Sequence, residues 1–513
     1  MDKTFYITTP IYYPSAKPHM GHAYSSIIAD FFARFKRIDD YQVYFLTGTD
    51  EHGLKIQRSA EKAGKEPLVF CDKISQTFRD LSDTLNLSNT DFIRTTEARH
   101  KKTVQHLWNE LEKNDDIYLS NYSGWYSVSD EAFYNEDEIE ELDGKKIAIS
   151  SKSPVEWIEE ESYFFRLSKW EKPLLEYYEA NPDFISPQSR KNEVISFVKS
   201  GLKDLSVSRK SFSWGIPVPN NKNHVIYVWL DALTNYLSAL NYPNTNDDLF
   251  KKFWPASIHL IGKDILRFHA VYWPAFLLAA KIDLPKRVYG HGWILSGEEK
   301  MSKSKGNILD PLEIIKEYGL DPLRYYLIKE VSFGNDGNIS QERLEDCINS
   351  DLANNYGNLC QRVTAFAIKN CNGKIPLEVK FHDEDLLILN KYKDNLDNIR
   401  LQIDNQNINF YIDYIVNSLF EANKYFNDQE PWKKKDDKIR LNTIVYTTLE
   451  IVRKISFLLY PIIPESSLKA LKIFDIEEKD IKLDTISNNE YLTKGNNIHK
   501  IDILFKKIEK NND

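Results

Sequence analysis

The first forty residues carry a strand signal, a proline-rich loop and a helix signal, and this order favours an α/β fold. Residues 5–8 are aromatic and β-branched, as in a buried strand, and three prolines interrupt residues 10–18. A helix is predicted from Gly21, because apolar side chains recur on one face at helical spacing: Ile27, Ile28, Phe31, Phe32 and Phe35. His19 and His22 therefore lie at a strand-to-helix turn.

The alternation of strands and helices continues downstream, with one interruption. Residues 43–46 predict a second strand that runs into the polar segment 47–53, and residues 257–262 predict a third. Polar groups at the carboxyl ends of parallel strands are where open α/β sheets bind ligands. From about 115 to 206 the segments are tyrosine- and acid-rich, which indicates an inserted subdomain. After about 346 the pattern is almost wholly helical.

These patterns predict a Rossmann-type parallel sheet that is split by an insertion and followed by an all-α bundle. At about 100–200 residues per domain, 513 residues suggest three or four domains. We expect the first half of the sheet domain at 1–114, the insertion at 115–206 and the second half at 207–290. A linker with a lysine-rich loop would span 291–345, and the helical domain 346–513.

The motif His19-Met20-Gly21-His22 has the properties of a phosphate site. Unpaired backbone N–H groups and the positive end of the helix dipole attract anions. The i, i+3 spacing lets both imidazoles face the same way, and Gly21 lets a purine ring approach the backbone. Helix capping would explain a single histidine equally well, but two histidines around a glycine favour phosphate contact.

A second candidate for phosphate contact is the loop Lys300-Met301-Ser302-Lys303-Ser304. It is polar, bracketed by glycines and followed by a helix that Asp310 opens and Gly319 ends. Compact ammonium groups on such a loop could follow a leaving pyrophosphate as negative charge builds on it. An ordinary solvated loop is the alternative when these lysines are considered alone.

Composition excludes several classes of protein. The net charge of −9 argues against indiscriminate nucleic-acid binding; a local basic surface such as the lysines at 433–435 stays open, although a solvated helix face explains that run as well. No apolar run approaches the roughly 18 residues of a membrane span, and no signal-peptide layout precedes the first strand. The four cysteines form no CxxC pair. We expect a cytoplasmic enzyme.

The histidine and lysine motifs, in this order and far apart, are similar to the paired signature of class I aminoacyl-tRNA synthetases. From about Phe5 to about Pro464 the chain resembles the methionyl-tRNA synthetase family within that class. The segments that carry this resemblance are TPIYY at 9–13, GTDEHG at 48–53, YVWLDA at 227–232, IGKDILRFH at 261–269 and GHGW at 290–293. The resemblance implies a class I catalytic fold with 115–206 as its connective-peptide insertion and 346–513 as an anticodon-binding bundle.

The resemblance also implies the site residues. Methionine would be held by Ile11, Tyr13, Asp50, Trp229, Ala232, Leu233, Tyr236, Ile265 and His269, with Asp50 on the ammonium group. ATP would be bound by His19, Gly21, His22, Gly262, Asp264, Lys300 and Lys303, of which the two histidines and the two lysines would be catalytic.

An aromatic pocket suits a thioether, since each sulfur–aromatic contact contributes about 0.3–1.5 kcal/mol. A purely apolar pocket distinguishes one methylene by only about 1–3 kcal/mol, so His269 or the Tyr13 hydroxyl could help to read the sulfur. Trp229 and Ile265, considered singly, are equally well explained as core residues.

The insertion departs from many relatives, which carry zinc knuckles that begin with CxxC. Ser127 and Asp130 stand at the corresponding positions, and no cysteine pair follows before Cys347. Since a tetrahedral zinc site needs about four N or S ligands, we expect no structural zinc. The chain also ends at Asp513, where some relatives continue into a dimerising tRNA-binding domain, so we expect a monomer.

Three residues of the helical segment resemble the family's anticodon-reading positions. Asn358 and Arg362 are four apart and would share a helix face, and Trp432 offers an aromatic surface for an unstacked base. Without the resemblance, a structural role explains all three.

The predicted activity is that of a methionine–tRNA ligase, with ATP and Mg²⁺, methionine and tRNA(Met) as its partners and no membrane. Methionyl-adenylate would form first, and the ribose of the terminal adenosine would then take the acyl group. A valine, leucine or isoleucine enzyme would need a longer editing insertion than 115–206, and the cysteine enzyme a zinc thiolate site. A tRNA-binding protein that has lost catalysis is the alternative outside this class.

Overall fold

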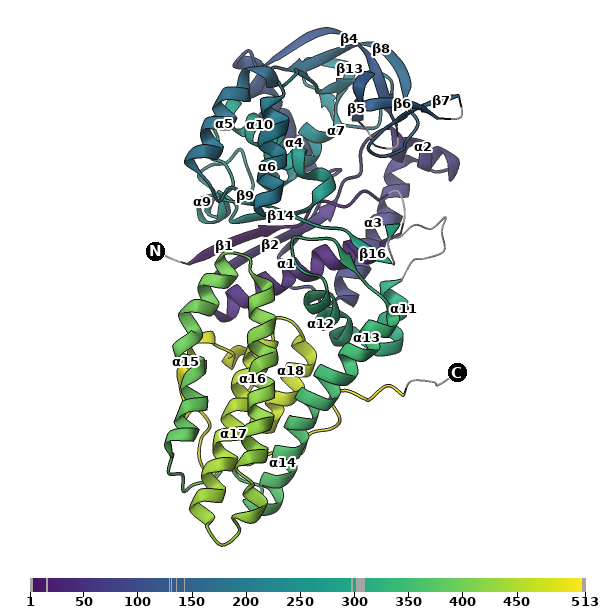
Figure 1. The fold of residues 1–513 in the computed structure, drawn as a ribbon. Coiled ribbons are helices and arrows are strands. Elements are labelled where there is room, and N and C mark those ends of the chain that lie inside the picture. Colours follow the sequence, from purple (N-terminus) through teal and green to yellow (C-terminus); the bar gives the residue numbers. More distant parts are fainter. Residues whose placement is uncertain are drawn as a thin grey trace. The chain divides into compact units, whose positions relative to one another are not determined.

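The structure is a computed structural model that describes residues 3–14, 17–128, 130, 132–134, 136–142, 144–296, 299–300 and 310–509. It divides into two compact units. Residues 4–18 and 43–291 form what we call the sheet unit, and residues 1–3, 19–42 and 292–513 form the helical unit. We describe each unit by itself (Figure 1).

The sheet unit is built on a six-stranded sheet in the order β3-β2-β1-β14-β15-β9. Its strands are β1 (Thr4–Thr8), β2 (Gln42–Thr49), β3 (Asp91–Arg94), β9 (Ile185–Ser186), β14 (Ile258–Gly262) and β15 (Val288–His291). Parallel register joins β1 to β14 at Ile7 and Ile258, and β14 to β15 at Leu260 and Tyr289. The strand order therefore reverses between β1 and β14, the point at which open α/β sheets bind ligands.

Short and medium helices complete this unit. They are α2 (Leu54–Lys62), α3 (Pro67–Thr84), α4 (Ala98–Lys113), α5 (Glu171–Ala180), α6 (Gln188–Lys199), α7 (Val228–Leu233), α8 (Asn235–Ser238), α9 (Asp248–Phe253) and α10 (Trp273–Ala279). The apolar core between helices and sheet is continuous and includes the fully buried indoles of Trp108 and Trp273.

The helix expected from about Asp264 to Leu278 is present but irregular. A 3-10 turn, η3 (Lys263–Ile265), precedes a π-helical segment, η4 (Phe268–Tyr272), and only then does α10 begin. Pro274 in α10 has no N–H to give to the carbonyl four residues earlier, that of Ala270. The hydroxyl of Tyr178 donates to this carbonyl at 2.5 Å instead. The wide turn thus keeps its backbone satisfied, and π-helical turns of this kind are frequent at functional sites.

The segment expected as an insertion contains a four-stranded antiparallel sheet in the order β10-β8-β4-β5. These strands are β4 (Ile117–Ser127), β5 (Ala132–Tyr134), β8 (Glu156–Phe165) and β10 (Leu205–Ser206), and a hairpin of β6 (Ile139–Leu142) and β7 (Lys145–Ala148) lies between them in sequence. A small sheet of β11 (Ser208–Arg209), β12 (Pro217–Val218) and β13 (Asn221–Ile226) comes next along the chain.

The helical unit contains α1 (Met20–Ile38), α11 (Pro311–Tyr318), α12 (Leu320–Glu330), α13 (Gln341–Cys347), α14 (Asn358–Asn370), α15 (Asp383–Asp404), α16 (Ile408–Asp428), α17 (Lys438–Leu459) and α18 (Pro464–Leu471). Helices α14 to α17 run alongside one another as a bundle (Figure 1). Three short strands, β16 (Ile294–Ser296), β17 (Glu299–Lys300) and β18 (Gly337–Asn338), form a separate sheet.

A buried ion-pair cluster ties α1 to the rest of the helical unit. The Asp30 carboxylate accepts hydrogen bonds from Arg34 at 2.8 Å and from Arg324 of α12 at 2.6 Å. Arg324 also donates to the carbonyl of Ile462 at 2.8 Å. Because removing one partner would leave a buried charge unpaired, this cluster fixes α1 on α12.

The structure confirms the predicted fold class, a parallel Rossmann-type sheet followed by a helical domain. The expected domain boundaries stay predictions. Two observations bear on them: β9 lies within 115–206 but belongs to the parallel sheet, and residues 19–42 cluster with the helical unit. No helix among the described residues is both long and apolar enough to span a membrane.

Candidate active site

The residues expected to hold methionine lie at the carboxyl ends of the central strands of the sheet unit. Ile11 and Tyr13 follow β1, Asp50 follows β2, and Ile265 and His269 follow β14. The others lie on two consecutive helices: Trp229, Ala232 and Leu233 on α7, and Tyr236 on α8.

Backbone pairing continues beyond the ends of β1 and β2 and fixes the position of Asp50. The N–H of Tyr12 donates to the carbonyl of Gly48 at 2.8 Å, and the N–H of Asp50 donates to the carbonyl of Tyr12 at 2.9 Å. Asp50 is buried, as a carboxylate that pairs with a substrate ammonium group would need to be.

One hydrogen-bond chain joins three of the expected methionine residues. Nδ1 of His269 donates to the carbonyl of Ile265 at 3.0 Å, so Nε2 is the acceptor for the Tyr236 hydroxyl at 2.7 Å. Burial lowers the pKa of His269 to about 4, and the imidazole is therefore neutral at pH 7. The neutral ring uses its donor on the backbone and its acceptor on Tyr236.

Aromatic rings surround the hydrogen bonds between Ile265, His269 and Tyr236. The Trp229 indole stacks on Phe268 with 3.6 Å between ring centroids, and Tyr236 stacks on His259 at 4.1 Å. The indole N–H of Trp229 is buried and has no hydrogen-bond partner among the described residues.

The polar groups suggested for reading the sulfur are already engaged. The Tyr13 hydroxyl donates to the carbonyl of His52 at 3.0 Å, and His269 is paired as described. Tyr13 and His269 can therefore contact a thioether only through the surfaces of their rings.

Gly262 and Asp264, expected near the nucleoside, lie together after β14. A Cβ added at Gly262 would stand 2.7 Å from Oδ1 of Asp264. A side chain at this position would displace the carboxylate, so the Asp264 side chain lies close over the backbone at the end of the strand.

The histidine motif caps its own helix in the helical unit. The N–H of Gly21 donates to Nδ1 of His19 at 3.1 Å, and the N–H of His19 donates to Nδ1 of His22 at 3.1 Å. The two rings stack with centroids 3.8 Å apart, as expected from the i, i+3 spacing. A Cβ at Gly21 would come within 3.0 Å of the His19 ring. Desolvation, with a smaller effect of His19, lowers the pKa of His22 well below its usual value.

The lysine loop is described only at its start. The backbone of Lys300 pairs with Leu295 in the β16–β17 hairpin. Lys303 lies outside the described residues. The helix predicted after the loop is α11, and its cap is as expected: Asp310 accepts from the N–H of Leu312 at 2.8 Å, and Gly319 ends the helix with φ of 92°.

The three residues expected to read an anticodon belong to the helical unit, and two of them share a cluster. Arg362 of α14 donates to Asn427 at 2.7 Å, and its guanidinium lies over the ring of Phe426. Phe426 in turn contacts the Trp432 ring edge-on at 6.2 Å. Trp432 is 40% exposed and is therefore not a core residue of the bundle. Asn358 lies one turn before Arg362 on the same helix.

Hydrogen bonds connect the positions at which a zinc knuckle would begin. The Asp130 carboxylate accepts from Ser153 and Tyr134 at 2.8 Å and from Ser151 at 2.5 Å, and its N–H donates to Ser127 at 3.3 Å. Hydroxyl groups thus gather around one carboxylate. Among the described residues, no group of three or more His, Cys, Asp or Glu could hold a metal ion.

A cavity of about 710 Å³ in the sheet unit, which we call the basic pocket, was not foreseen from the sequence. Lys55, Arg58 and Lys62 line it from one face of α2, and Lys145 and Lys146 line it from β7. Within the described part of the chain, the first four have no ion-pair partner. The Nζ of Lys55 lies 5.2 Å from the centre of the Tyr13 ring, so the pocket begins beside an expected methionine residue.

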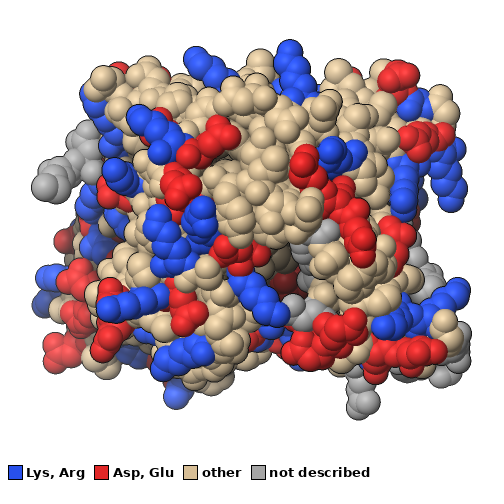
Figure 2. Space-filling view, turned by 90° about the horizontal axis from the view of Figure 1, so that it is seen from above, with Lys and Arg blue, Asp and Glu red and all other residues tan. Residues whose placement is uncertain are grey.

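Acidic and basic side chains alternate over the face drawn in Figure 2. The lining of the basic pocket differs, because Glu156 is the single acidic residue among its described lining residues. The sequence did show that Lys55, Arg58 and Lys62 would share one face of a helix. Helical spacing does not show, however, that the cations of β7 lie opposite this face.

Comparisons with known proteins agree with this architecture. The family model for class I tRNA synthetases (M) matches residues 5–142 and 138–364, and that for the anticodon binding domain of methionyl tRNA ligase matches residues 376–513. The methionine–tRNA ligase of Brucella suis is 51% identical over 474 residues, with 92% of each chain covered. That of Rickettsia felis is 49% identical over 513 residues, with 99% of each chain covered.

A solved structure is equally similar. The Mycobacterium tuberculosis methionyl-tRNA synthetase in complex with methionyl-adenylate superposes with a TM-score of 0.95 at 46% identity. The match covers 98% of this chain and 99% of that one.

Proposed function

Because the chain belongs to the methionyl-tRNA synthetases of class I, we propose that it attaches L-methionine to tRNA(Met) with the cleavage of ATP to AMP and pyrophosphate. The carboxylate of methionine attacks the α-phosphorus of ATP, so that methionyl-adenylate forms and pyrophosphate leaves. A ribose hydroxyl of the terminal adenosine then attacks the acyl carbon, and AMP leaves. Neither step needs a nucleophile from the protein.

One observation supports the amino-acid assignment above the others: Tyr236, His269 and Ile265 form a single chain at the carboxyl end of β14. In this proposal the rings of Tyr13, Trp229 and Tyr236 contact the thioether, and Asp50 pairs with the ammonium group. Ile11, Ala232 and Leu233 complete the apolar wall. A buried carboxylate and a neutral imidazole fit a zwitterion whose charge lies at one end and whose side chain is soft and apolar.

The phosphate contacts are assigned to the two motifs. His19 and His22 present stacked rings at the N-terminus of α1, where the helix dipole favours negative charge. Lys300 and Lys303 supply positive charge for the leaving pyrophosphate. Gly262 and Asp264 receive the nucleoside. Mg²⁺ accompanies the ATP phosphates, and we expect the protein to work without structural zinc.

For the second substrate, the basic pocket supports a path for the 3′ strand of tRNA. This strand must reach the methionine carbonyl, and the pocket begins at Lys55 beside Tyr13. The cations from Lys55 to Lys62 extend about 10 Å along α2 at 1.5 Å per residue, enough for about two backbone phosphates. Asn358, Arg362 and Trp432 would read the anticodon at the other end of the tRNA. We propose that the enzyme acts as a cytoplasmic monomer.

Amino-acid-dependent ATP–pyrophosphate exchange tests this function. The purified protein should catalyse exchange with methionine and with none of the other proteinogenic amino acids at a comparable rate. It should then charge tRNA(Met) in the presence of methionine and ATP. Exchange that is absent, or faster with another amino acid, would contradict the proposal.

A further inference from the structure

A buried cluster in the sheet unit takes no part in the proposed chemistry. The Asp231 carboxylate of α7 lies between two imidazoles: Nδ1 of His52 is 2.6 Å from Oδ2, and Nε2 of His100 is 2.7 Å from Oδ1. The three side chains are at most 4% exposed. Burial alone would raise the pKa of Asp231, but His52 and His100 outweigh it and lower the pKa to about 2. Asp231 is therefore an anion that both rings hold.

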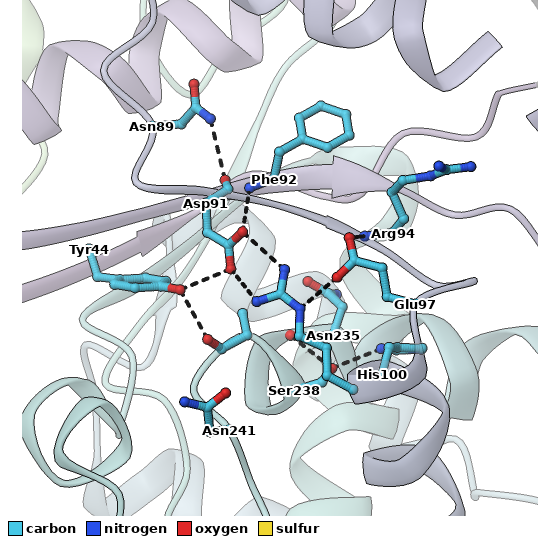
Figure 3. A network of polar contacts seen from close by, with 12 residues as sticks. Tyr44, Asn89, Asp91, Phe92, Arg94, Glu97, His100, Asn235, Ser238 and Asn241 are labelled. Carbon is cyan, nitrogen blue, oxygen red and sulfur yellow. Dashed lines mark hydrogen bonds and ion pairs between the residues drawn. The ribbon is translucent and has the colours of Figure 1, made fainter. Parts of the chain in front are cut away.

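The bonding continues from His100 into α8. Nδ1 of His100 lies 2.8 Å from the Ser238 hydroxyl, and Figure 3 shows the two side chains pointing toward each other. The Ser238 hydroxyl donates to the carbonyl of Thr234 at 2.9 Å. The cluster therefore links α4, α7 and α8 through side chains alone.

His52 connects the same carboxylate to the loop after β2. Its carbonyl accepts the Tyr13 hydroxyl at 3.0 Å, and its ring contacts the Trp214 indole edge-on. The neighbouring Glu51 is held separately by Arg94, at 2.6 and 3.0 Å. Asp50 thus precedes two residues that are anchored on different partners.

We propose that Asp231, with His52 and His100, is the positioning group that sets the width of the methionine pocket. This inference rests on the proposed function. Apart from the residues contributed by β14 and the turn after it, the main parts of the pocket are attached to this carboxylate. Trp229, Ala232 and Leu233 share α7 with Asp231, Tyr236 shares α8 with Ser238, and Asp50 and Tyr13 are reached through His52.

An ionic centre suits such a role because its hydrogen bonds restrict the positions of the side chains more tightly than apolar packing does. A carboxylate between two imidazoles has few orientations that satisfy both oxygens, whereas aliphatic side chains can repack at small cost. Loosening the centre by a fraction of an ångström would move the pocket walls relative to one another. Affinity for the amino acid and discrimination between side-chain lengths would then change, while ATP binding would not.

Asp231→Asn tests the proposal, since the amide keeps the size of the side chain but cannot accept from both imidazoles in the same way. In pyrophosphate exchange we expect the KM for methionine to rise at least tenfold, with the KM for ATP within about twofold of wild type. The preference in kcat/KM for methionine over ethionine, which is one methylene longer, should fall at least fivefold.

The matched control is Tyr44→Phe, which removes a hydroxyl that lies 3.0 Å from both the Asp91 carboxylate and the carbonyl of Ala239, in the neighbouring network of Figure 3. It should lower the melting temperature without changing the KM for methionine. If Asp231→Asn does not fold, His52→Asn replaces it, because His100 then still pairs the buried carboxylate. For His52→Asn we expect the KM for methionine to rise less than in Asp231→Asn, and the KM for ATP to stay unchanged.

A folded variant with a KM for methionine within twofold of wild type would overturn the inference. The same holds if Tyr44→Phe raises that KM equally, or if the KM values for ATP and methionine rise together. Failure of the proposed function is distinguishable, because the wild-type protein would then lack methionine-dependent exchange altogether.

Discussion

The Tyr236 hydroxyl donates to Nε2 of His269 at 2.7 Å, and burial, which lowers the pKa of His269 to about 4, keeps this ring neutral at pH 7. Two other histidines, the partly exposed His22 and the buried His259, also have pKa values well below the usual one because of desolvation. A histidine that is neutral when folded takes up a proton on unfolding at any pH between its folded and unfolded pKa values.

We therefore expect stability to be complete above the unfolded pKa of about 6.5 and to fall as the pH drops toward 4. His269→Gln should flatten this dependence by up to about 1.4 kcal/mol per pH unit, the contribution of one proton. Urea unfolding of both proteins between pH 4 and 8 measures the difference. If the stability of wild type and of His269→Gln changed with pH in the same way, His269 would not be neutral in the folded protein.

The phosphate motifs should matter for chemistry more than for folding. His22→Ala and Lys303→Ala are each expected to lower methionine-dependent pyrophosphate exchange by about 100-fold or more, the effect of losing one preorganised contact to developing charge. Lys316→Ala, on the exposed side of α11, is the control for a lysine near the loop. Near-normal exchange in both motif variants would remove them from the catalytic machinery.

Trp432 should act on tRNA alone. Trp432→Ala is expected to remove about 1–3 kcal/mol of tRNA binding, roughly 5- to 150-fold in kcat/KM for tRNA, through the loss of base stacking. Exchange should be unchanged. Because the side chain is 40% exposed, the melting temperature should change little. A large drop in melting temperature, with exchange and charging falling together, would instead indicate a structural role.

The basic pocket predicts a salt-dependent effect at the other end of the tRNA. Lys145→Ala/Lys146→Ala should weaken tRNA charging and reduce the dependence of tRNA affinity on salt, because fewer phosphate counterions are displaced. Adenylate formation should continue as in wild type. The control is Lys251→Ala/Lys252→Ala on α9, which removes the same charge from an exposed helix. Equal losses in the two double variants would show only a general charge effect.

Treatment with metal chelators should leave the fold intact, because we expect no structural zinc. The hydroxyls of Ser151, Ser153 and Tyr134 already satisfy the Asp130 carboxylate, so chelators should not change the melting temperature, and elemental analysis should find less than one zinc per chain. Asp130→Ala should lower the stability of the insertion, seen as faster proteolysis there. Stoichiometric zinc would refute this prediction.

Local patterns were sufficient for elements whose causes are local. The Asp310 cap, the Gly319 stop and the stacking of His19 on His22 arise from neighbours in sequence, and the structure has all of them. Strands β1, β2 and β14 were likewise visible from their β-branched and aromatic runs. The family resemblance supplied the residues that we propose for the methionine pocket, which no periodicity could have collected from four separate stretches of the chain.

The features that could not be predicted from the sequence depend on long-range contacts. His100 gave no signal, since its partner Asp231 lies 131 residues away. Residues 185 and 186 are too short a strand to recognise, and only the pairing with β15 reveals β9. The π-helical turn η4 was also hidden, and Tyr178, whose hydroxyl donates to the Ala270 carbonyl within it, belongs to a different helix.

The contact between Tyr178 and the Ala270 carbonyl has a consequence for how such a chain can vary. Tyr178 lies within the segment expected as the insertion, yet its hydroxyl completes the backbone of the turn that carries His269. Exchanging residues 115–206 for the corresponding piece of a relative would leave the Ala270 carbonyl bare unless the donor brought a hydroxyl to the same place. A change of sequence at Tyr178 is therefore felt at the turn that carries His269.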